Sequence, residues 1–354
     1  MRTKLVLIAI VLAGVSVNSC KKDLDEDIKH TTTPYALQIP AGFPPMVIPA
    51  DNPLTVEGVE LGHHLFFDPI LSSNGLSCSS CHHVDKAYST PYHINPAGDT
   101  VSVMSLVNIG FRRNFSWTGR HHTSEDVCIE DFEPEFFNTN MDTLRYRLAA
   151  SPKYRNMFNR AFGVNDFKNW SDIDLKTKIV KAIGQYLRTL ISADSRFDRY
   201  LRHEIMLSPT ELNGMALFYT EDGDCFHCHE LPLMTGQMVT NTGMDSIPAG
   251  YDQGLFNFTG LQTDIGRFVT PTLRNIELTA PYMHDGRFKT LDEVIEFYNS
   301  GFHQSSPNID PVMLKPGKEF GLMLTPYERQ CLVDFLKTFT DTSFINNPAY
   351  QNPL

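Results

Sequence analysis

The sequence predicts a mainly α-helical fold made of two similar domains with long loops, related by duplication. The first observation is a pattern that occurs twice: Gly62-His63-His64-Leu65-Phe66 precedes Cys78-Ser79-Ser80-Cys81-His82, and Gly214-Met215-Ala216-Leu217-Phe218 precedes Cys225-Phe226-His227-Cys228-His229. Internal repetition of this kind indicates an ancient duplication. The second observation is that helix-start signals recur along the chain. The third is that few runs alternate polar and apolar residues as strands do.

Three helix starts are predicted from capping signals. A hydroxyl residue stands three positions before a glutamate in Ser208-Pro209-Thr210-Glu211, Thr290-Leu291-Asp292-Glu293 and Thr325-Pro326-Tyr327-Glu328. The hydroxyl side chain caps the first helical turn, and the glutamate reaches back to the capping residue. A longer helix between the two halves is predicted from apolar residues at helical spacing, which are Ile179, Ile183, Tyr186, Leu187 and Leu190.

Length and composition indicate a two-domain globular protein. At 354 residues the chain is long enough for two domains, each with its own core. Hydrophobic residues make up 42% and charged residues 20%, which is typical of globular proteins and too apolar for a disordered chain. The formal net charge of -11 argues against a nucleic-acid partner, because no basic stripe offsets it. It suits a small basic protein docking on an acidic face.

The N-terminus predicts export. Residues 1–19 have the pattern of a lipoprotein-type signal peptide, with Arg2 and Lys4 before an apolar stretch that is short for a bilayer span. Cys20 stands at the expected cleavage site and would carry the lipid, which places the protein on the periplasmic side as a membrane-anchored lipoprotein. An ordinary cleaved signal that leaves Cys20 as a free thiol is the alternative. Residues 20–52, polar and then proline-rich, are predicted to form a tether from the membrane.

The repeated Cys-x-x-Cys-His motif predicts a covalently bound haem c in each domain. Two cysteines three positions apart can each form a thioether with one haem vinyl group, and the next histidine then directs its imidazole at the iron. A zinc site built from both cysteine pairs would not need these histidines, and neither would a redox disulfide. The predicted attachment residues are Cys78, Cys81 and His82 for the first haem and Cys225, Cys228 and His229 for the second.

Two cytochrome c-like haem domains are therefore expected, at residues 53–200 and 201–345. Cys128 and Cys331 remain outside the haem motifs. In an exported protein they could form a disulfide if their Cα atoms lie within range. Two buried free thiols are the preferred interpretation.

Further motifs surround the haem motifs. In the first half they are Leu61-Gly62-His63-His64-Leu65-Phe66-Phe67-Asp68, Leu71-Ser72, Ser105-Leu106-Val107-Asn108 and Trp117-Thr118-Gly119-Arg120, and in the second half Pro271-Thr272-Leu273-Arg274-Asn275 and Thr279-Ala280-Pro281-Tyr282-Met283-His284-Asp285-Gly286. With them, the chain from about Pro53 to Thr340 resembles the bacterial dihaem cytochrome c peroxidases and their relative MauG.

The resemblance implies a peroxidase. Members of this family reduce hydrogen peroxide to water with electrons from a small cytochrome c or copper protein. The N-terminal haem is the peroxide site, and the C-terminal haem relays or stores an electron. Trp117 matches the family tryptophan that lies between the haems; a core aromatic is the alternative for this residue.

The distal iron ligands depart from the classical peroxidases. In the classical peroxidases a methionine is the distal ligand of the C-terminal haem iron. The residue at that position here is Tyr298, as in MauG. A phenolate oxygen stabilises oxidised iron, whereas a thioether raises the haem potential. Met283 or Met313 could still supply a sulfur, and Tyr298 could be a buried core residue. In the classical enzymes a loop histidine is the distal ligand of the peroxide haem, and His93 lies within one residue of that position. If His93 does not bind the iron, the first haem is five-coordinate.

The family's distal acid–base pair and its calcium site match only in part. The positions of the glutamine and glutamate that move the peroxide proton are Val127 and Phe137. One deletion brings Glu135 to the glutamate position, and a carboxylate near the iron is needed to move a proton between the two peroxide oxygens. Glu133 and Asp126 lie close by. The family also holds a calcium ion by backbone carbonyls, for which Thr279 and Pro281 match, but its asparagine ligand is replaced by Ser102.

Three functions are consistent with these residues. The first is a cytochrome-c peroxidase with an external electron donor. The second is a MauG-like oxidase that withdraws electrons from residues of a partner protein, which Tyr298 favours. The third is an electron-transfer cytochrome with two six-coordinate irons. The sequence leaves the oligomeric state open, and a homodimer is one expectation.

Overall fold

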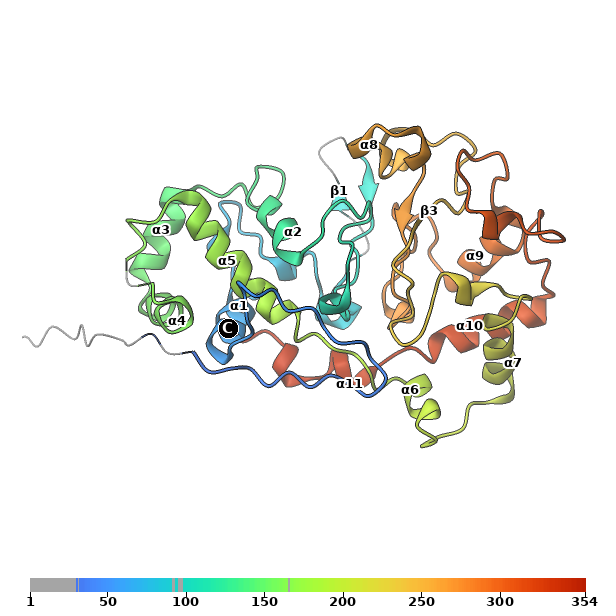
Figure 1. Ribbon diagram of the computed structural model, residues 1–354, viewed down its shortest axis with the longest axis horizontal. Helices are drawn as coiled ribbons and strands as arrows, with labels where there is room; N and C mark the ends of the chain where they lie inside the picture. Colours follow the sequence, from blue (N-terminus) through green and yellow to red (C-terminus); the bar gives the residue numbers. More distant parts are fainter. Residues whose placement is uncertain (1–29, 31, 91–92, 95–97, 165) are drawn as a thin grey trace, which may run out of the picture.

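The computed structural model describes residues 30, 32–90, 93–94, 98–164 and 166–354 (Figure 1). The predicted signal peptide, residues 1–19, and the predicted lipid attachment site, Cys20, lie outside the described residues. Within the described ranges, no helix combines the length and the apolar composition that crossing a membrane would need.

The described chain is mainly helical, as predicted, with a few very short strands. The strands form two antiparallel pairs, β1 (His93–Ile94) with β2 (Thr100–Val101) and β3 (Val239–Thr240) with β4 (Phe268–Val269). In Figure 1, β1 and β3 lie between two groups of helices, one for each half of the chain.

The first half, on the left of Figure 1, contains α1 (Val56–Phe67), α2 (Ser124–Glu130), α3 (Met141–Ala150), α4 (Pro152–Phe162) and α5 (Asp172–Leu187). Helix α1 packs against both α4 and α5. The long helix predicted from apolar spacing is α5. The five residues that predicted it are all buried, the last of them just beyond the end of the helix.

The second half, on the right of Figure 1, contains α6 (Arg196–Leu201), α7 (Pro209–Phe218), α8 (Phe256–Thr259), α9 (Leu291–Glu296) and α10 (Pro326–Lys337). The last helix, α11 (Thr342–Ile345), lies below the helices of the first half, near the centre of the view. All three predicted capping signals are confirmed. Ser208, Thr290 and Thr325 each form a capping box at the start of α7, α9 and α10. Helix α9 continues into a single π-helical turn, Phe297–Gly301.

Short 3-10 turns connect these elements. They are Pro69–Leu71, Cys78–Ser80, Val84–Lys86, Ile109–Phe111, Cys225–His227, Gly250–Gln253, Gln262–Asp264, Ile276–Leu278, Pro311–Leu314 and Pro348–Tyr350. Two of them, Cys78–Ser80 and Cys225–His227, begin at the first cysteine of each haem motif.

A glycine at the same position of the repeated pattern lets two helices cross closely in each half. A Cβ atom on Gly62 of α1 would lie 1.9 Å from the carbonyl oxygen of Ala182 on α5. A Cβ atom on Gly214 of α7 would also lie 1.9 Å from a carbonyl oxygen, that of Cys331 on α10. Any larger residue would therefore push the paired helices apart, together with the haem motif that follows each of them.

Each half has a hydrophobic core of its own. The larger core takes side chains from α1, α3, α4 and α5, and the smaller one from α6, α7, α9 and α10. The chain after α10 returns to the first half. Phe344 of α11 belongs to the larger core, and the Tyr350 carbonyl accepts a hydrogen bond from the Tyr88 hydroxyl (2.7 Å).

Residues 32–52, the described part of the predicted tether, pack on the fold. The Phe43 ring lies edge-on against Phe111, with 5.5 Å between ring centres. The guanidinium of Arg274 lies 5.0 Å from the centre of the same ring. This segment therefore contacts both halves.

Candidate functional site

The first Cys-x-x-Cys-His motif forms a tight turn whose histidine is oriented by the backbone. The N–H groups of Cys81 and His82 both donate to the carbonyl of Cys78 (3.1 and 2.9 Å). The His82 imidazole is held through Nδ1, 2.8 Å from the Tyr88 carbonyl oxygen. An Nδ1–H that donates to a carbonyl leaves Nε2 free to bind a metal. Burial lowers the pKa of His82 to about 4, so the imidazole stays neutral.

The second motif repeats this geometry. The N–H groups of Cys228 and His229 both donate to the carbonyl of Cys225 (3.2 and 3.0 Å). Nδ1 of His229 lies 3.2 Å from the carbonyl oxygen of Met234. Burial lowers the pKa of His229 to about 4 as well. Both halves therefore present a neutral imidazole beside two cysteines.

The motif cysteines form no disulfide, and they are not poised for redox exchange. Burial raises the pKa of Cys225 to about 12 and that of Cys228 to about 11. A redox-active pair instead keeps one thiol at a lowered pKa. Cys128 and Cys331 are also free and buried, as predicted, and lie in different halves.

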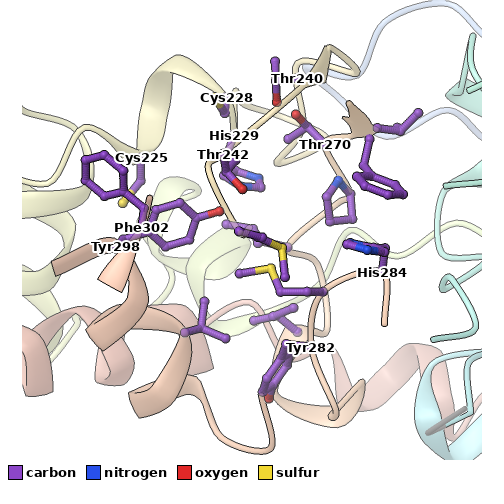
Figure 2. Close-up of a pocket in the computed structure, with 18 of the residues that line it drawn as sticks. Cys225, Cys228, His229, Thr240, Thr242, Thr270, Tyr282, His284, Tyr298 and Phe302 are labelled. Atoms are coloured by element: carbon purple, nitrogen blue, oxygen red, sulfur yellow. The ribbon is translucent and has the colours of Figure 1, made fainter. Parts of the chain in front are cut away.

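A large cavity adjoins the second motif (Figure 2). Cys225, Cys228 and His229 line it together with Tyr298, and its walls are mainly apolar. Its volume is about 240 Å³, against roughly 10–15 Å³ for one bound water. A large apolar cavity with two thiols and a neutral imidazole in its wall fits a covalently attached haem.

Tyr298 reaches the cavity from the π-helical turn after α9. Figure 2 shows its hydroxyl pointing toward Thr242 and His229. Burial raises the pKa of Tyr298 well above its usual value, so its phenolate forms at neutral pH only beside a cation. The alternative sulfur ligands, Met283 and Met313, line the same cavity.

Trp117 lines the cavity from the first half of the chain. Its indole N–H donates to the carbonyl of Ser102 (2.6 Å), and the Ser102 N–H donates to the carbonyl of His284 (2.8 Å). The Trp117 carbonyl accepts from the N–H of Val269 on β4 (2.8 Å). Trp117 is therefore fixed at the border of the two halves.

His284 is the counterpart of Trp117 in the second half. Residues 115–121 and 282–288 each begin and end on an isolated antiparallel bridge, and Trp117 and His284 stand third in these turns. In both turns the preceding residue and the glycine two positions later have positive φ, at 62° and 69° in the first turn and 69° and 69° in the second. The buried His284 ring stacks on Phe268 at 3.7 Å.

The predicted distal residues of the first haem are only partly placed. His93 belongs to β1, but its side chain lies outside the described structure. Glu135 is exposed in the loop between α2 and α3.

A carboxyl group that the sequence did not single out acts electrostatically on the first motif. Asp131 follows α2 directly, and its charge adds to burial in raising the pKa of Cys78 and Cys81. Burial, and then the charge of Glu130, raise the pKa of Asp131 itself to about 7. Sequence alone could not separate this aspartate from its exposed acidic neighbours.

The carbonyl donors predicted for calcium lie at the border of the halves. Thr279 and Pro281 both line the cavity. The hydroxyl of Ser102, which stands at the asparagine position, donates to the carbonyl of Pro281 (3.5 Å). One of the two carbonyls thus already has a hydroxyl partner.

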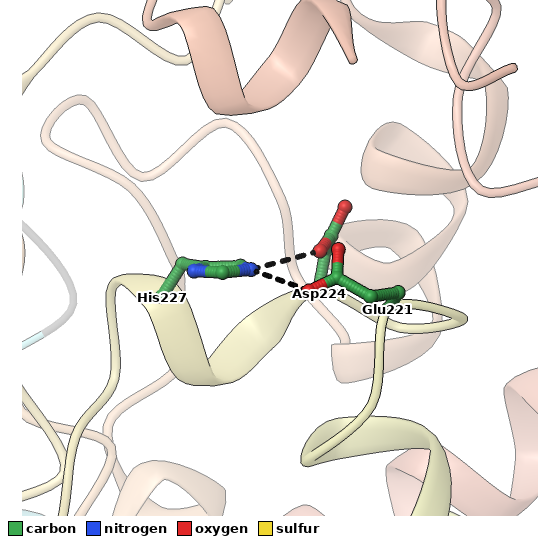
Figure 3. A group of neighbouring side chains, drawn as sticks. All are labelled: Glu221, Asp224 and His227. Carbon is green, nitrogen blue, oxygen red and sulfur yellow. Dashed lines mark hydrogen bonds and ion pairs between the residues drawn. The ribbon is translucent and has the colours of Figure 1, made fainter. Parts of the chain in front are cut away.

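An acidic group beside the second motif forms an ion-pair network. Figure 3 shows Nε2 of His227 between Glu221 and Asp224, 3.3 Å from a carboxylate oxygen of each. The ammonium of Lys315 lies 2.7 Å from Glu221, 2.9 Å from Asp224 and 2.8 Å from the His227 Nε2. A cation of the protein thus already neutralises these carboxylates.

Comparison with known proteins agrees with this geometry. The family model of the di-haem cytochrome c peroxidases matches residues 56–205. The cytochrome-c peroxidase IdrP2 of Denitromonas iodatirespirans is 31% identical over 317 residues, which cover 80% of this chain and 81% of that protein. The methylamine utilization protein MauG of Methylorubrum extorquens is 32% identical over 300 residues, covering 82% and 80%.

A solved structure shows the same fold over nearly the whole chain. The crystal structure of a MauG-like protein associated with microbial copper homeostasis is 32% identical, covers 90% of this chain and 99% of its own, and has a TM-score of 0.78. Fold and attachment turns together define a protein of the dihaem c-type cytochrome class. The chain belongs to the di-haem cytochrome c peroxidase family, in which MauG proteins are also found.

Proposed function

We propose that this protein is a dihaem cytochrome-c peroxidase that reduces hydrogen peroxide to water with electrons from a small cytochrome c or copper protein. The observation that carries the proposal is the pair of matching haem-attachment turns, each with a buried neutral imidazole held through Nδ1. Cytochrome-c peroxidases among the relatives, such as IdrP2, support the activity.

The two haem domains, residues 53–200 and 201–345, are proposed to have arisen by duplication. Matching features in the two halves support this. Asn108 and Asn275 both adopt a left-handed conformation before a 3-10 turn. Their N–H groups donate to the carbonyls of Leu190 and Phe339, just after α5 and α10 respectively. The glycines that allow close crossing of α1 with α5 and of α7 with α10 add to this correspondence.

Each residue of the sites has a proposed role. Cys78, Cys81 and His82 hold the first haem, and Cys225, Cys228 and His229 hold the second. Bound haem iron supplies the redox chemistry that breaks the O–O bond. Trp117, fixed between the halves by its bond to Ser102, provides the path for electrons from the second site to the first.

Proton transfer at the first site is assigned to Asp131, with Glu135 as the alternative. A general base works best when its pKa lies near the working pH and when it lies within reach of the proton. The pKa of about 7 meets the first condition, and the effect of the Asp131 charge on the pKa of Cys78 and Cys81 supports a position near the first motif. His93 is retained as the distal ligand of the first iron.

A MauG-like oxidation of a partner protein is the second candidate function. Tyr298 favours it, because its hydroxyl points toward His229 in the cavity (Figure 2). A phenolate at this position would stabilise oxidised iron on the second haem. An electron-transfer cytochrome without enzyme activity is the third candidate.

The remaining parts of the proposal concern location and partners. A lipoprotein signal in residues 1–19 and a lipid on Cys20 are proposed to hold the protein on the periplasmic side of a membrane. A calcium ion at the carbonyls of Thr279 and Pro281 and a homodimer complete the proposal. Metal analysis after treatment with a calcium chelator tests the ion, and light scattering tests the dimer.

Stopped-flow mixing of the holoprotein with peroxide separates the three functions. A peroxidase shows rapid turnover with a reduced small cytochrome c and one high-spin haem in the oxidised protein. A MauG-like oxidase instead stores the oxidising equivalents in a long-lived state without turning over the donor. Two low-spin haems that do not react with peroxide would leave only the electron-transfer function.

A further inference from the structure

Arg112 projects from the first half of the chain into the cavity beside the second haem motif. It directly follows the 3-10 turn Ile109–Phe111 and lines the same cavity as His229 and Tyr298. A side chain of one half thus forms part of the wall of the other half's cavity.

The backbone on both sides of Arg112 is fixed by one residue of the second half. The amide of Gln237 donates to the carbonyl of Phe111 (3.0 Å) and accepts from the N–H of Arg113 (2.6 Å). Asn114 also donates to the Gln237 carbonyl (3.1 Å). The direction of the Arg112 side chain is therefore set by the contact between the two halves.

The guanidinium of Arg112 has no anionic partner among the described residues. Its Nη2 atom is buried without a hydrogen-bond acceptor. Its Nη1 atom contacts the thioether sulfur of Met104, which is neutral and a weak acceptor. Burial lowers the pKa of Arg112 to about 10, so the group remains charged at neutral pH.

The acidic residues that line the cavity are already engaged elsewhere. Asp224 pairs with Lys315, and the Lys318 ammonium lies 3.4 Å from it. Asp245 pairs with Arg287, and Asp252 lies 2.8 Å from Nε2 of His284. None of these carboxylates forms an ion pair with Arg112 among the described residues.

A buried cation without a counter-charge costs several kcal/mol, and buried charges in proteins are accordingly paired. An anion bound at Nη2 of Arg112 would therefore balance this charge in the cavity. Haem carries two propionate carboxylates, and a guanidinium binds a carboxylate through parallel hydrogen bonds.

We infer that Arg112 binds a propionate of the haem held by Cys225 and Cys228, so that the first half supplies the counter-charge of the haem in the second. This inference rests on the proposed covalent haem. The contact would raise the reduction potential of that haem, because a nearby cation disfavours the more positive oxidised iron. It would also keep the propionate ionised across the neutral pH range.

The test compares Arg112→Gln with Arg112→Lys, which keeps the charge, and with Arg113→Gln, which removes the exposed neighbouring arginine. Spectroelectrochemical titration of each holoprotein gives the potentials of both haems between pH 5 and pH 8. In Arg112→Gln the equilibrium constant for reduction of the second haem should fall about tenfold at pH 8. This corresponds to a reduction potential lower by ~59 mV for one electron. The shift should shrink toward pH 5, where the freed propionate takes up a proton.

In Arg112→Lys the reduction potential of the second haem should stay close to the wild-type value. In Arg113→Gln it should equal the wild-type value. Loss of the second haem from Arg112→Gln but not from Arg112→Lys would also support the inference. It is overturned if Arg112→Gln leaves the second haem's potential at the wild-type value across this pH range, or if only the first haem's potential moves. A wild-type protein that carries no second covalent haem would instead overturn the proposed function.

Discussion

Trp117 and His284, which occupy equivalent turns in the two halves, are joined through one residue. The indole N–H of Trp117 donates to the Ser102 carbonyl, and the Ser102 N–H donates to the carbonyl of His284. The equivalent positions thus meet at the border of the halves, although one carries an aromatic indole and the other an imidazole paired with Asp252. This arrangement places the proposed electron path where the two halves touch.

Replacing Trp117 by phenylalanine should slow peroxide turnover while leaving both haem spectra in place. The indole N–H that anchors the side chain to Ser102 is lost, and with it the most easily oxidised ring at the border. Trp170→Phe is the matched control, because Trp170 packs on the core of the first half. Steady-state oxidation of a reduced small cytochrome c measures the effect. Equal oxidation rates for the two variants would show that Trp117 is not part of the electron path.

Replacing Tyr298 by phenylalanine should change the spectrum of the second haem. The variant loses the oxygen that points toward His229, so iron coordination changes without a large change in cavity shape. Tyr219→Phe is the control, since among the described residues the Tyr219 hydroxyl hydrogen-bonds only to the Met234 sulfur (3.9 Å). Electron paramagnetic resonance of the oxidised proteins makes the comparison. An unaltered second-haem signal in Tyr298→Phe would shift the ligand assignment to Met283 or Met313.

Peroxide turnover should fall as pH drops below about 7 if Asp131 is the base. A base accepts a proton only in its ionised form, and the pKa of Asp131 is raised to about 7, so acid conditions remove the active form. Asp131→Asn should lower kcat/KM by roughly 10²–10⁴ and abolish this acidic limb. Glu135→Gln should keep both the rate and the limb. The reverse result, with only Glu135→Gln impaired, would return the role to Glu135.

The raised pKa of Asp131 also predicts a pH-dependent stability. Because the folded protein binds a proton that the unfolded chain releases above its usual pKa of 3.8, this group's unfavourable effect on stability grows as pH rises from about 4 to about 7. Asp131→Asn should therefore be more stable than the wild type above pH 7 and similar to it near pH 4. Thermal unfolding at several pH values measures this. A constant difference at all pH values would show that the carboxyl does not titrate in this range.

The ion pair of Arg274 with Asp198 should be essential for the second half. Both side chains are buried, and two parallel hydrogen bonds of 2.8 Å join them. Arg274→Met would leave a buried carboxylate unpaired and should cost about 3–5 kcal/mol of unfolding free energy. Arg196→Met, which breaks the exposed pair with Glu211, should cost about 0–1 kcal/mol. Denaturant titration distinguishes these losses, and similar values for the two variants would contradict the buried-pair account.

The elements set by local signals were predictable from sequence. Capping boxes located the starts of α7, α9 and α10, apolar spacing located α5, and the haem motifs located both attachment turns. These features depend on residues a few positions apart, so a single sequence carries them.

Features that depend on contacts between distant segments could not be predicted. Nothing local in the sequence indicates that α11 packs on the first half, or that residues 32–52 lie against both halves. Arg112 and Arg113 are adjacent and identical in type, yet one has a buried nitrogen in the cavity wall and the other is exposed. Only the fold separates them.

Intact-mass spectrometry of the denatured holoprotein tests the central claim most directly. A polypeptide with covalent haem at both thiol pairs should have the mass of the processed chain plus two haems. Cys78→Ala with Cys81→Ala should remove one of them, and Cys225→Ala with Cys228→Ala the other. A wild-type mass equal to that of the polypeptide alone would contradict the account at its foundation.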